Sequence, residues 1–271
     1  MTAARPLAPF NRREVPVVAT SSLGPYRLVE VEDLEAPEVR AGQFHMLSSA
    51  SKWESDEAGR PWLARAISFL STDGVGRIVF LVDAVGPGTS ALASLSTGDS
   101  MQLVGPLGNG FPDPNEALRP LLVGGGIGLA PVLALSDQLK RDDIDHDLVL
   151  GFRTADHASA VRSREGVVLA TDDGSVGHHG TVIEPAERLL AEGSREVFAC
   201  GPPAMMNAIK TSAEKFEAPI WLALESPMAC GFGACFGCAV ETRDGIIRLC
   251  VDGPVVSGSA LESISATGRA E

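Results

Sequence analysis

The strongest constraint on this 271-residue chain is the placing of four of its five cysteines. Cys230, Cys235 and Cys238 lie in the stretch MACGFGACFGC, and Cys250 follows, which gives the pattern C-x4-C-x2-C-x11-C. The region 225–271 is too short for a hydrophobic core of its own, and the cysteines are the candidates for holding it together. Four thiolates can hold either a tetrahedral zinc ion or an iron–sulfur cluster.

The spacing of these cysteines favours a 2Fe-2S cluster. Zinc ribbons usually have two facing Cys-x2-Cys pairs, whereas this region has only Cys235 and Cys238 at that spacing. C-x4-C-x2-C with a more distant fourth cysteine is the plant-ferredoxin pattern. The small neighbours Gly231, Gly233 and Gly237 let backbone N–H groups approach the sulfur atoms. Structural zinc and buried free thiols remain as alternatives.

Composition places the chain among globular proteins and argues against some partners. Hydrophobic residues make up 45% of it, and no apolar run approaches the roughly 20 residues of a membrane span. The N-terminus lacks an apolar signal-peptide core, so we expect a cytoplasmic protein whose thiols bind metal or do redox chemistry and do not form disulfides. The net charge of −13, without a basic run, argues against nucleic-acid binding.

Two patterns of secondary structure divide the rest of the chain. Short strands separated by turns, with one short helix in 89–99, predict an antiparallel β-barrel or sandwich. Alternating strands and helices after the Gly/Pro-rich loop 105–118 predict a parallel sheet with helices on both faces. We therefore expect three regions, at 1–112, 113–224 and 225–271. The predicted strands lie at 15–20, 26–32, 42–48, 65–71, 76–85, 99–105, 119–125, 145–152, 166–174, 195–201, 220–224 and within 244–257, and the predicted helices at 127–141, 181–193 and 202–216.

A glycine-rich turn in the second region predicts a dinucleotide site. LLVGGGIGLAPV joins a buried strand to a helix, and a helix N-terminus after such a turn binds pyrophosphate. The turn differs from the G-x-G-x-x-G fingerprint and could also be only a tight turn. FACGPP ends a later strand, and ligands of open α/β sheets lie beyond such ends. The candidate nucleotide contacts are Gly124, Gly125, Gly126, Gly128, Cys200, Gly201 and Pro202.

Two further features of the second region each have two interpretations. Asp172 and Asp173 follow a predicted strand, where carboxylates would disfavour a 2′-phosphate and select NADH, or would simply cap a turn. Cys200 lies either near a nicotinamide ring or in the core as an ordinary buried thiol.

The first region holds weaker signals for a flavin. RAISF places Arg65 and Ser68 on one strand, and VGPGTSAL places Gly88 and Thr89 at a helix start. An arginine and such a turn could together bind the phosphates of a flavin dinucleotide. Arg65 as a surface charge and Gly88-Thr89 as a helix cap are the alternatives.

The order of these motifs resembles the ferredoxin–NAD(P) reductase superfamily. R-x-I-S, G-x-G-T, GPLGNGF, GGGIGLAP, ACGPP and the cysteine pattern follow one another from about residue 13 to 257. Within that superfamily, MACGFGACFGCAVET and LCVDGPVV resemble the electron transfer subunits of dihydroorotate dehydrogenases. The resemblance implies an FAD-binding barrel, an NAD-binding α/β domain and a C-terminal 2Fe-2S lobe.

The resemblance also implies cofactor contacts, a partner and a reaction. FAD would contact Arg65, Ala66, Ile67, Ser68, Leu81, Val82, Asp83, Gly88 and Thr89, and the cluster would be held by Cys230, Cys235, Cys238 and Cys250. A separate FMN-containing subunit, in an expected heterotetramer, would oxidise dihydroorotate, and electrons would pass through the cluster and FAD to NAD+. No catalytic acid or base is then needed in this chain.

Two residues depart from the family pattern, and two other functions remain open. Ala66 stands where the family usually has proline, and Asp83 where it often has an arginine, so that an acid would repel a flavin phosphate. A related reductase serving a hydrogenase or another partner would share these motifs. A zinc-bearing, non-enzymatic regulatory protein is the alternative of another class.

Overall fold

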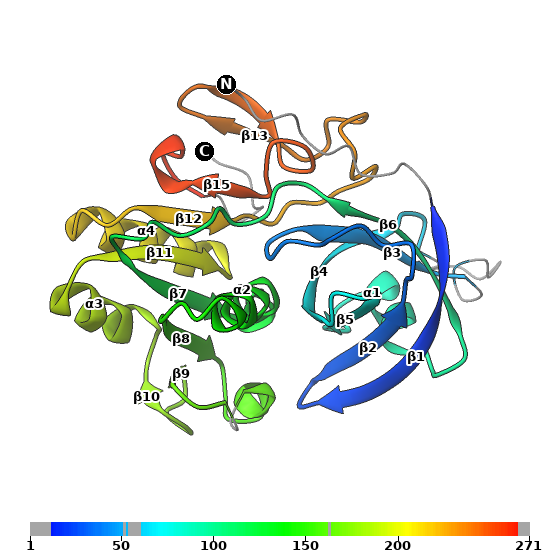
Figure 1. Ribbon diagram of the computed structural model, residues 1–271, viewed down its shortest axis with the longest axis horizontal. Helices are drawn as coiled ribbons and strands as arrows, with labels where there is room; N and C mark the ends of the chain where they lie inside the picture. The colour runs from blue at the N-terminus through cyan, green and yellow to red at the C-terminus, as the bar shows by residue number, and fades with distance from the viewer. Residues whose placement is uncertain (1–11, 51–52, 54–60, 162–163, 265–271) are drawn as a thin grey trace.

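The computed structural model describes residues 12–50, 53, 61–161 and 164–264. Figure 1 shows three parts, a barrel on the right, a sheet flanked by helices on the left, and a small lobe along the top. Much of the sequence region 48–63 lies outside the described residues.

The first part is a closed antiparallel barrel with the strand order β1-β2-β5-β4-β3-β6. Along β1 the first residues alternate between buried and exposed, as expected for a strand with one face on a core. The short helix α1 (Pro87–Ala93) connects β5 to β6. The strands are β1 (Arg13–Leu23), β2 (Tyr26–Glu32), β3 (Phe44–Ser49), β4 (Arg65–Thr72), β5 (Arg77–Val82) and β6 (Ser100–Leu107).

The second part is a seven-stranded sheet with the order β10-β9-β8-β7-β11-β12-β15. Its strands are parallel except for β15. The strands are β7 (Arg119–Gly125), β8 (Asp147–Phe152), β9 (Val167–Thr171), β10 (His178–His179), β11 (Arg195–Cys200), β12 (Ile220–Ala223) and β15 (Val255–Ser257). The predicted barrel and parallel sheet are confirmed.

Helices cover both faces of this sheet (Figure 1). Helix α2 (Leu129–Arg141) lies between the sheet and the barrel and packs against β4. Helices α3 (Ile183–Glu192) and α4 (Pro203–Lys215) lie on the opposite face and contact each other. Short 3₁₀ turns, η1 (Gly126–Gly128), η2 (His157–Ala160) and η3 (Gly258–Ala260), complete the helical elements. No helix among the described residues is both long and apolar enough to cross a membrane.

Alternate side chains of the sheet belong to two hydrophobic cores. Leu122 and Phe198 face α2 and join the core of the barrel. Leu121 and Val197 face the other way and join a second core, which reaches Met46 of β3 and the cysteine lobe. The lobe is thus packed onto the first two parts by the second core.

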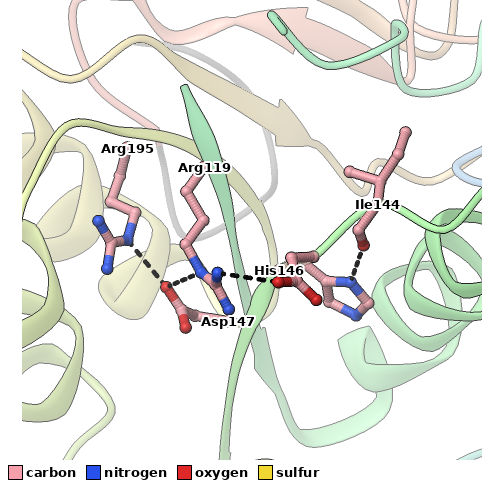
Figure 2. Close-up of polar contacts among 6 residues, drawn as sticks. Arg119, Ile144, His146, Asp147 and Arg195 are labelled. Atoms are coloured by element: carbon pink, nitrogen blue, oxygen red, sulfur yellow. Dashed lines mark hydrogen bonds and ion pairs between the residues drawn. The ribbon is translucent and has the colours of Figure 1, made fainter. Parts of the chain in front are cut away.

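Ion pairs link neighbouring strands at the amino-terminal edge of the sheet. Asp147, at the start of β8, accepts hydrogen bonds from Nε of Arg195 at 2.8 Å and from Nε of Arg119 at 3.1 Å (Figure 2). His146 binds the carbonyl oxygen of Ile144 beside them, at 3.0 Å. The charges at this edge neutralise one another, whereas the opposite, carboxyl edge stays open to a cleft.

The third part consists of the cysteine loop and the hairpin of β13 (Ala239–Thr242) and β14 (Gly245–Arg248). From this lobe the chain returns as β15, which pairs antiparallel with β12. The end of the predicted third region therefore contributes an edge strand to the sheet of the second. A βαβ rhythm does not indicate such an antiparallel addition.

Candidate functional site

The fold brings the four candidate cysteine ligands together in two pairs. The side chains of Cys230 and Cys235 lie close enough to influence each other's protonation, as do those of Cys250 and Cys238. The backbone N–H of Cys250 also donates to the sulfur of Cys238, at 3.4 Å. Cys250 and Cys230 are close enough to interact electrostatically, which joins the two pairs.

The thiols at the two ends of this cluster have opposite pKa shifts. Partial burial acts to raise the pKa of Cys230, but hydrogen bonds from the N–H groups of Phe232 and Cys235, among others, outweigh it and lower the pKa to about 6. Burial, followed by the hydrogen bond with Cys238, raises the pKa of Cys250 to about 12. The loop therefore already supplies N–H donors that stabilise negative sulfur.

The paired arrangement fits a two-iron cluster better than a single metal ion. Zinc needs all four sulfurs around one centre. In a 2Fe-2S cluster each iron takes two protein ligands, and two adjacent thiol pairs meet that need.

Glycines and one arginine shape the loop around the thiols. Gly231 and Gly233 have φ values of +78° and +91°, and a Cβ on Gly231 would lie 2.5 Å from Cγ of Met46. The Arg248 guanidinium donates to the carbonyl of Gly233 at 2.9 Å and lies 5.0 Å from the ring centroid of Phe236. The backbone is thus held close to the barrel.

A cleft of about 590 Å³ lies between the barrel and the sheet. A volume of this order is typical of cofactor sites. Eight of the predicted cofactor contacts line it, namely Ala66, Ile67, Ser68, Leu81, Asp83, Thr89, Gly201 and Pro202. Val82 is not among the lining residues and is buried. Asp83, which departs from the family pattern, does face this cleft.

Arg65 and Gly88, predicted to act together, are in contact outside the cleft lining. A Cβ on Gly88 would lie 2.5 Å from Nε of Arg65, so a larger residue there would displace the guanidinium from its present position. Arg65 also donates to the carbonyl of Leu63. The N–H of Gly86 donates to the Thr89 hydroxyl at 3.1 Å, which is the contact of a helix-capping side chain.

The glycine-rich turn between β7 and α2 is packed tightly against its neighbours. A Cβ on Gly124 would lie 2.6 Å from Leu150, and one on Gly125 would lie 2.5 Å from Met205. A Cβ on Gly128 would lie 2.5 Å from the carbonyl oxygen of Cys200. Gly126, with φ +54°, has no such neighbour within 4 Å. Three of the four glycines thus make room for protein atoms, and only Gly126 faces open space.

Replacing Gly128 by alanine is expected to destabilise the second domain. The new Cβ would meet main-chain atoms of Cys200 and Gly201, which cannot move as a flexible side chain would. We expect a loss of about 1–3 kcal/mol in the free energy of unfolding, measured by urea denaturation. Gly126→Ala should cost about 1 kcal/mol, for its positive φ alone. A Gly128→Ala protein as stable as wild type would contradict the observed packing.

Sequence reasoning missed the polar groups that follow β12. Glu225 borders the cleft and is accessible to solvent from it. Protein atoms around its carboxyl group displace water and raise its pKa. Burial and then the charge of Glu225 raise the pKa of the Cys200 thiol. The Ser226 hydroxyl is buried without a hydrogen-bond partner among the described residues. These groups follow no motif, and only the fold places them at the cleft.

Asp172 and Asp173 lie just beyond β9, at the same carboxyl edge. Hydrogen bonds from the Ser175 side chain and then its N–H group lower the pKa of Asp173. Asp173 thus shapes its own turn, and Asp172 is exposed. Neither residue lines the cleft.

The cysteine loop continues directly from the wall of the cleft. Residues 225–228 line the cleft, and Cys230 follows two positions later. On the other side, Gly231 packs on Met46, whose register partner in β4 is the cleft residue Ala66. A group held by the cysteines would therefore adjoin a group bound in the cleft.

Comparisons with known proteins agree with this arrangement. A family model described as the iron-sulfur cluster binding domain of dihydroorotate dehydrogenase B matches residues 225–262. The chain is 38% identical, over 83% of its length and 87% of the relative's, to the dihydroorotate dehydrogenase B (NAD(+)) electron transfer subunit of Clostridium acetobutylicum. It is 36% identical to the protein of that name from Streptococcus pneumoniae, over 88% and 96% of the two chains.

Solved structures give the same fold. A chain of an NADH-dependent reduced ferredoxin-NADP oxidoreductase matches with a TM-score of 0.76 and 27% identity, covering 96% of this chain and 91% of that one. Phthalate dioxygenase reductase, at 16% identity, matches in fold with a TM-score of 0.62 over 92% and 96% of the two chains. By sequence similarity over most of its length, the chain belongs to the family of dihydroorotate dehydrogenase B (NAD(+)) electron transfer subunits.

Proposed function

We propose that this chain is the electron transfer subunit of an NAD-dependent dihydroorotate dehydrogenase. It works with a separate FMN-containing subunit that oxidises dihydroorotate, a reaction of pyrimidine biosynthesis. The complex is a cytoplasmic heterotetramer. Residues 1–112 bind FAD, residues 113–224 bind NAD(H), and residues 225–271 hold a 2Fe-2S cluster.

The observation that carries the proposal is that the cysteine site and the cleft share one segment of the chain. The segment that lines the cleft, 225–228, runs straight into the cysteine loop, and Gly231 packs beside the strand that carries Ala66. A carrier of single electrons must adjoin a flavin if electrons are to pass between them. A structural metal lobe needs no such closeness to a cofactor cleft.

The four cysteines are the proposed ligands of the cluster. Cys230 and Cys235 would hold one iron, and Cys238 and Cys250 the other, as their pairing suggests. The N–H donors around Cys230 would stabilise the extra negative charge of the reduced cluster.

The cleft residues are the proposed contacts of FAD and NAD(H). When bound, FAD supplies the chemistry that links hydride transfer with NAD(H) to transfer of single electrons. Ala66, Ile67, Ser68 and Leu81 would contact FAD from the barrel side of the cleft, and Arg65 beside Gly88 would bind a phosphate. Glu225 and Ser226 present polar groups from the opposite wall, where they can orient a ring by hydrogen bonding. The protein thus contributes positioning and exclusion of water.

The names of the related subunits specify NAD(+) as the nucleotide, and one feature of this chain favours the same nucleotide. Asp172 is exposed just beyond β9, at the carboxyl edge of the sheet, where its carboxylate would disfavour a 2′-phosphate. Asp173 lies beside it and is bonded within its own turn. We therefore propose NAD(H) as the co-substrate in preference to NADP(H).

Purification of the tagged chain from its native cells without air tests the proposal. We expect an FMN protein to co-purify and the complex to reduce NAD+ when dihydroorotate is added. Visible absorption should show both flavin and iron–sulfur bands. A hydrogenase or another redox subunit in place of the FMN protein would overturn the proposed pathway, and a colourless, zinc-loaded chain would overturn electron transfer altogether.

A further inference from the structure

The C-terminal segment of the described chain is fastened to α4 by one asparagine. Nδ2 of Asn207 donates to the carbonyl oxygen of Ile264 at 2.6 Å, and the N–H of Ile264 donates to Oδ1 of Asn207 at 2.8 Å. A side-chain amide has both a donor and an acceptor, so it can bind the two main-chain groups of one residue as a neighbouring strand would. The two bonds fix the position and the orientation of Ile264.

Ile264 forms part of the cleft wall. It is 5% exposed and packs in the second core together with Met206 and Leu261. It also lines the cleft beside Pro203 and Met206 of α4. A residue distant in sequence from α4 is thus built into the nucleotide side of the cleft.

The position of Ile264 separates it from the proposed flavin contacts. Those contacts come from barrel strands, whereas Ile264 is fastened to the helix that starts directly after Gly201 and Pro202, at the carboxyl edge of β11. In sheets of this type ligands bind beyond that edge. An apolar side chain there suits a flat, weakly polar ring, while Glu225 and Ser226 supply the polar groups of the same cleft.

We infer that Asn207 is a positioning residue that holds Ile264 as the apolar wall for the nicotinamide end of NAD(H). The inference rests on the proposed function, since it takes NAD(H) as the ligand of this cleft. Asn207 need not touch the nucleotide, because it acts through the main chain of Ile264. Asn207 should therefore not affect the binding of the adenosine and pyrophosphate portions of the ligand.

Two single variants and their combination test this inference in the intact complex. Asn207→Ala and Ile264→Ala should each raise the Kd for NAD+ about tenfold. The Kd is measured from the change in the flavin absorption spectrum as NAD+ is added. The double variant should bind no more weakly than either single variant, because both changes remove the same wall. In steady-state assays KM for NAD+ should rise more than kcat falls.

ADP-ribose is the control ligand and Thr211→Ala the control variant. ADP-ribose lacks the nicotinamide ring, so its affinity, measured by calorimetry, should be the same for wild type and all variants. Thr211 lies on α4 beyond Asn207, is exposed, and donates only to the carbonyl oxygen of Asn207 at 3.0 Å. Its replacement should leave the affinity for NAD+ unchanged.

The outcomes separate the inference from the proposed function. A wild-type complex that binds neither NAD+ nor ADP-ribose would overturn the proposed function. A wild type that binds both, with variants that bind NAD+ equally well, would overturn only the inference, as would equal weakening of NAD+ and ADP-ribose. If Asn207→Ala fails to fold, Ile264→Ala compared with the conservative Ile264→Val decides, since only the former removes the wall.

Discussion

Cys235→Ser is expected to abolish electron transfer between dihydroorotate and NAD+ while FAD remains bound. Cys235 is one of the four proposed ligands, and serine binds iron more weakly than a thiolate does. The visible bands of the cluster and the paramagnetic resonance signal of its reduced form should disappear. NADH-dependent reduction of ferricyanide should persist, because that reaction needs only FAD and the nucleotide site.

The exposure of Cys235 makes this substitution informative. Its side chain is exposed, in contrast to the buried Cys238 and Cys250, so the oxygen atom itself should cost the folded chain little. Cys200→Ser is the matched control, since Cys200 lies in β11 and outside the two thiol pairs. It should leave the cluster spectrum unchanged, and any effect on activity should be confined to nicotinamide turnover. An unchanged cluster signal in Cys235→Ser would refute the ligand set.

The cysteine site could be predicted because its information is local. The spacing from Cys230 to Cys250 lies in one short stretch, and Gly231 and Gly233 within it have the positive φ values that glycine adopts readily. The barrel and the parallel sheet were likewise predictable, since alternation and βαβ rhythm are properties of neighbouring residues. The antiparallel addition of β15 to β12 was not, because nothing near residue 255 indicates which strand it will meet.

The walls of the cleft depend on contacts between distant segments. Glu225, Ser226 and Ile264 lie outside the motifs used in the sequence analysis, and the fold makes them site residues by placing them at the cleft. At the glycine-rich turn, by contrast, a local motif was a poor guide to the space around it. Its pattern indicated room for a pyrophosphate, yet the space beside Gly125 and Gly128 is taken by Met205 and Cys200. Glycine spacing alone does not distinguish close packing from close approach of a ligand.

A histidine buried in the barrel predicts a loss of stability in mild acid. His45 in β3 is fully buried, its ring packs edge-on against Phe80, and neither ring nitrogen has a hydrogen-bond partner among the described residues. Burial and then the positive charge of Arg13 lower the pKa of His45 to about 3. Arg13 is itself held by Asp33 at 2.8 Å, so its charge stays in place.

The direction of the pH effect follows from the two states. Below pH 6.5 the unfolded chain binds a proton at His45, whereas the native barrel does so only near pH 3. Protonation of His45 therefore favours unfolding. The stability that neutral His45 contributes is fully present above pH 6.5 and is lost as the pH falls toward 3. Between pH 7 and pH 5 this one group should remove about 2 kcal/mol from the free energy of unfolding.

Urea denaturation at pH 7, 6 and 5, with FAD in constant excess, measures this loss. In His45→Phe, which keeps a flat ring in the same pocket, the fall between pH 7 and pH 5 should shrink by about 2 kcal/mol, whatever the variant's stability at pH 7. His179→Gln alters an exposed histidine and should leave the fall unchanged. Equal pH dependence in wild type and His45→Phe would mean that His45 is charged or solvated in the native barrel.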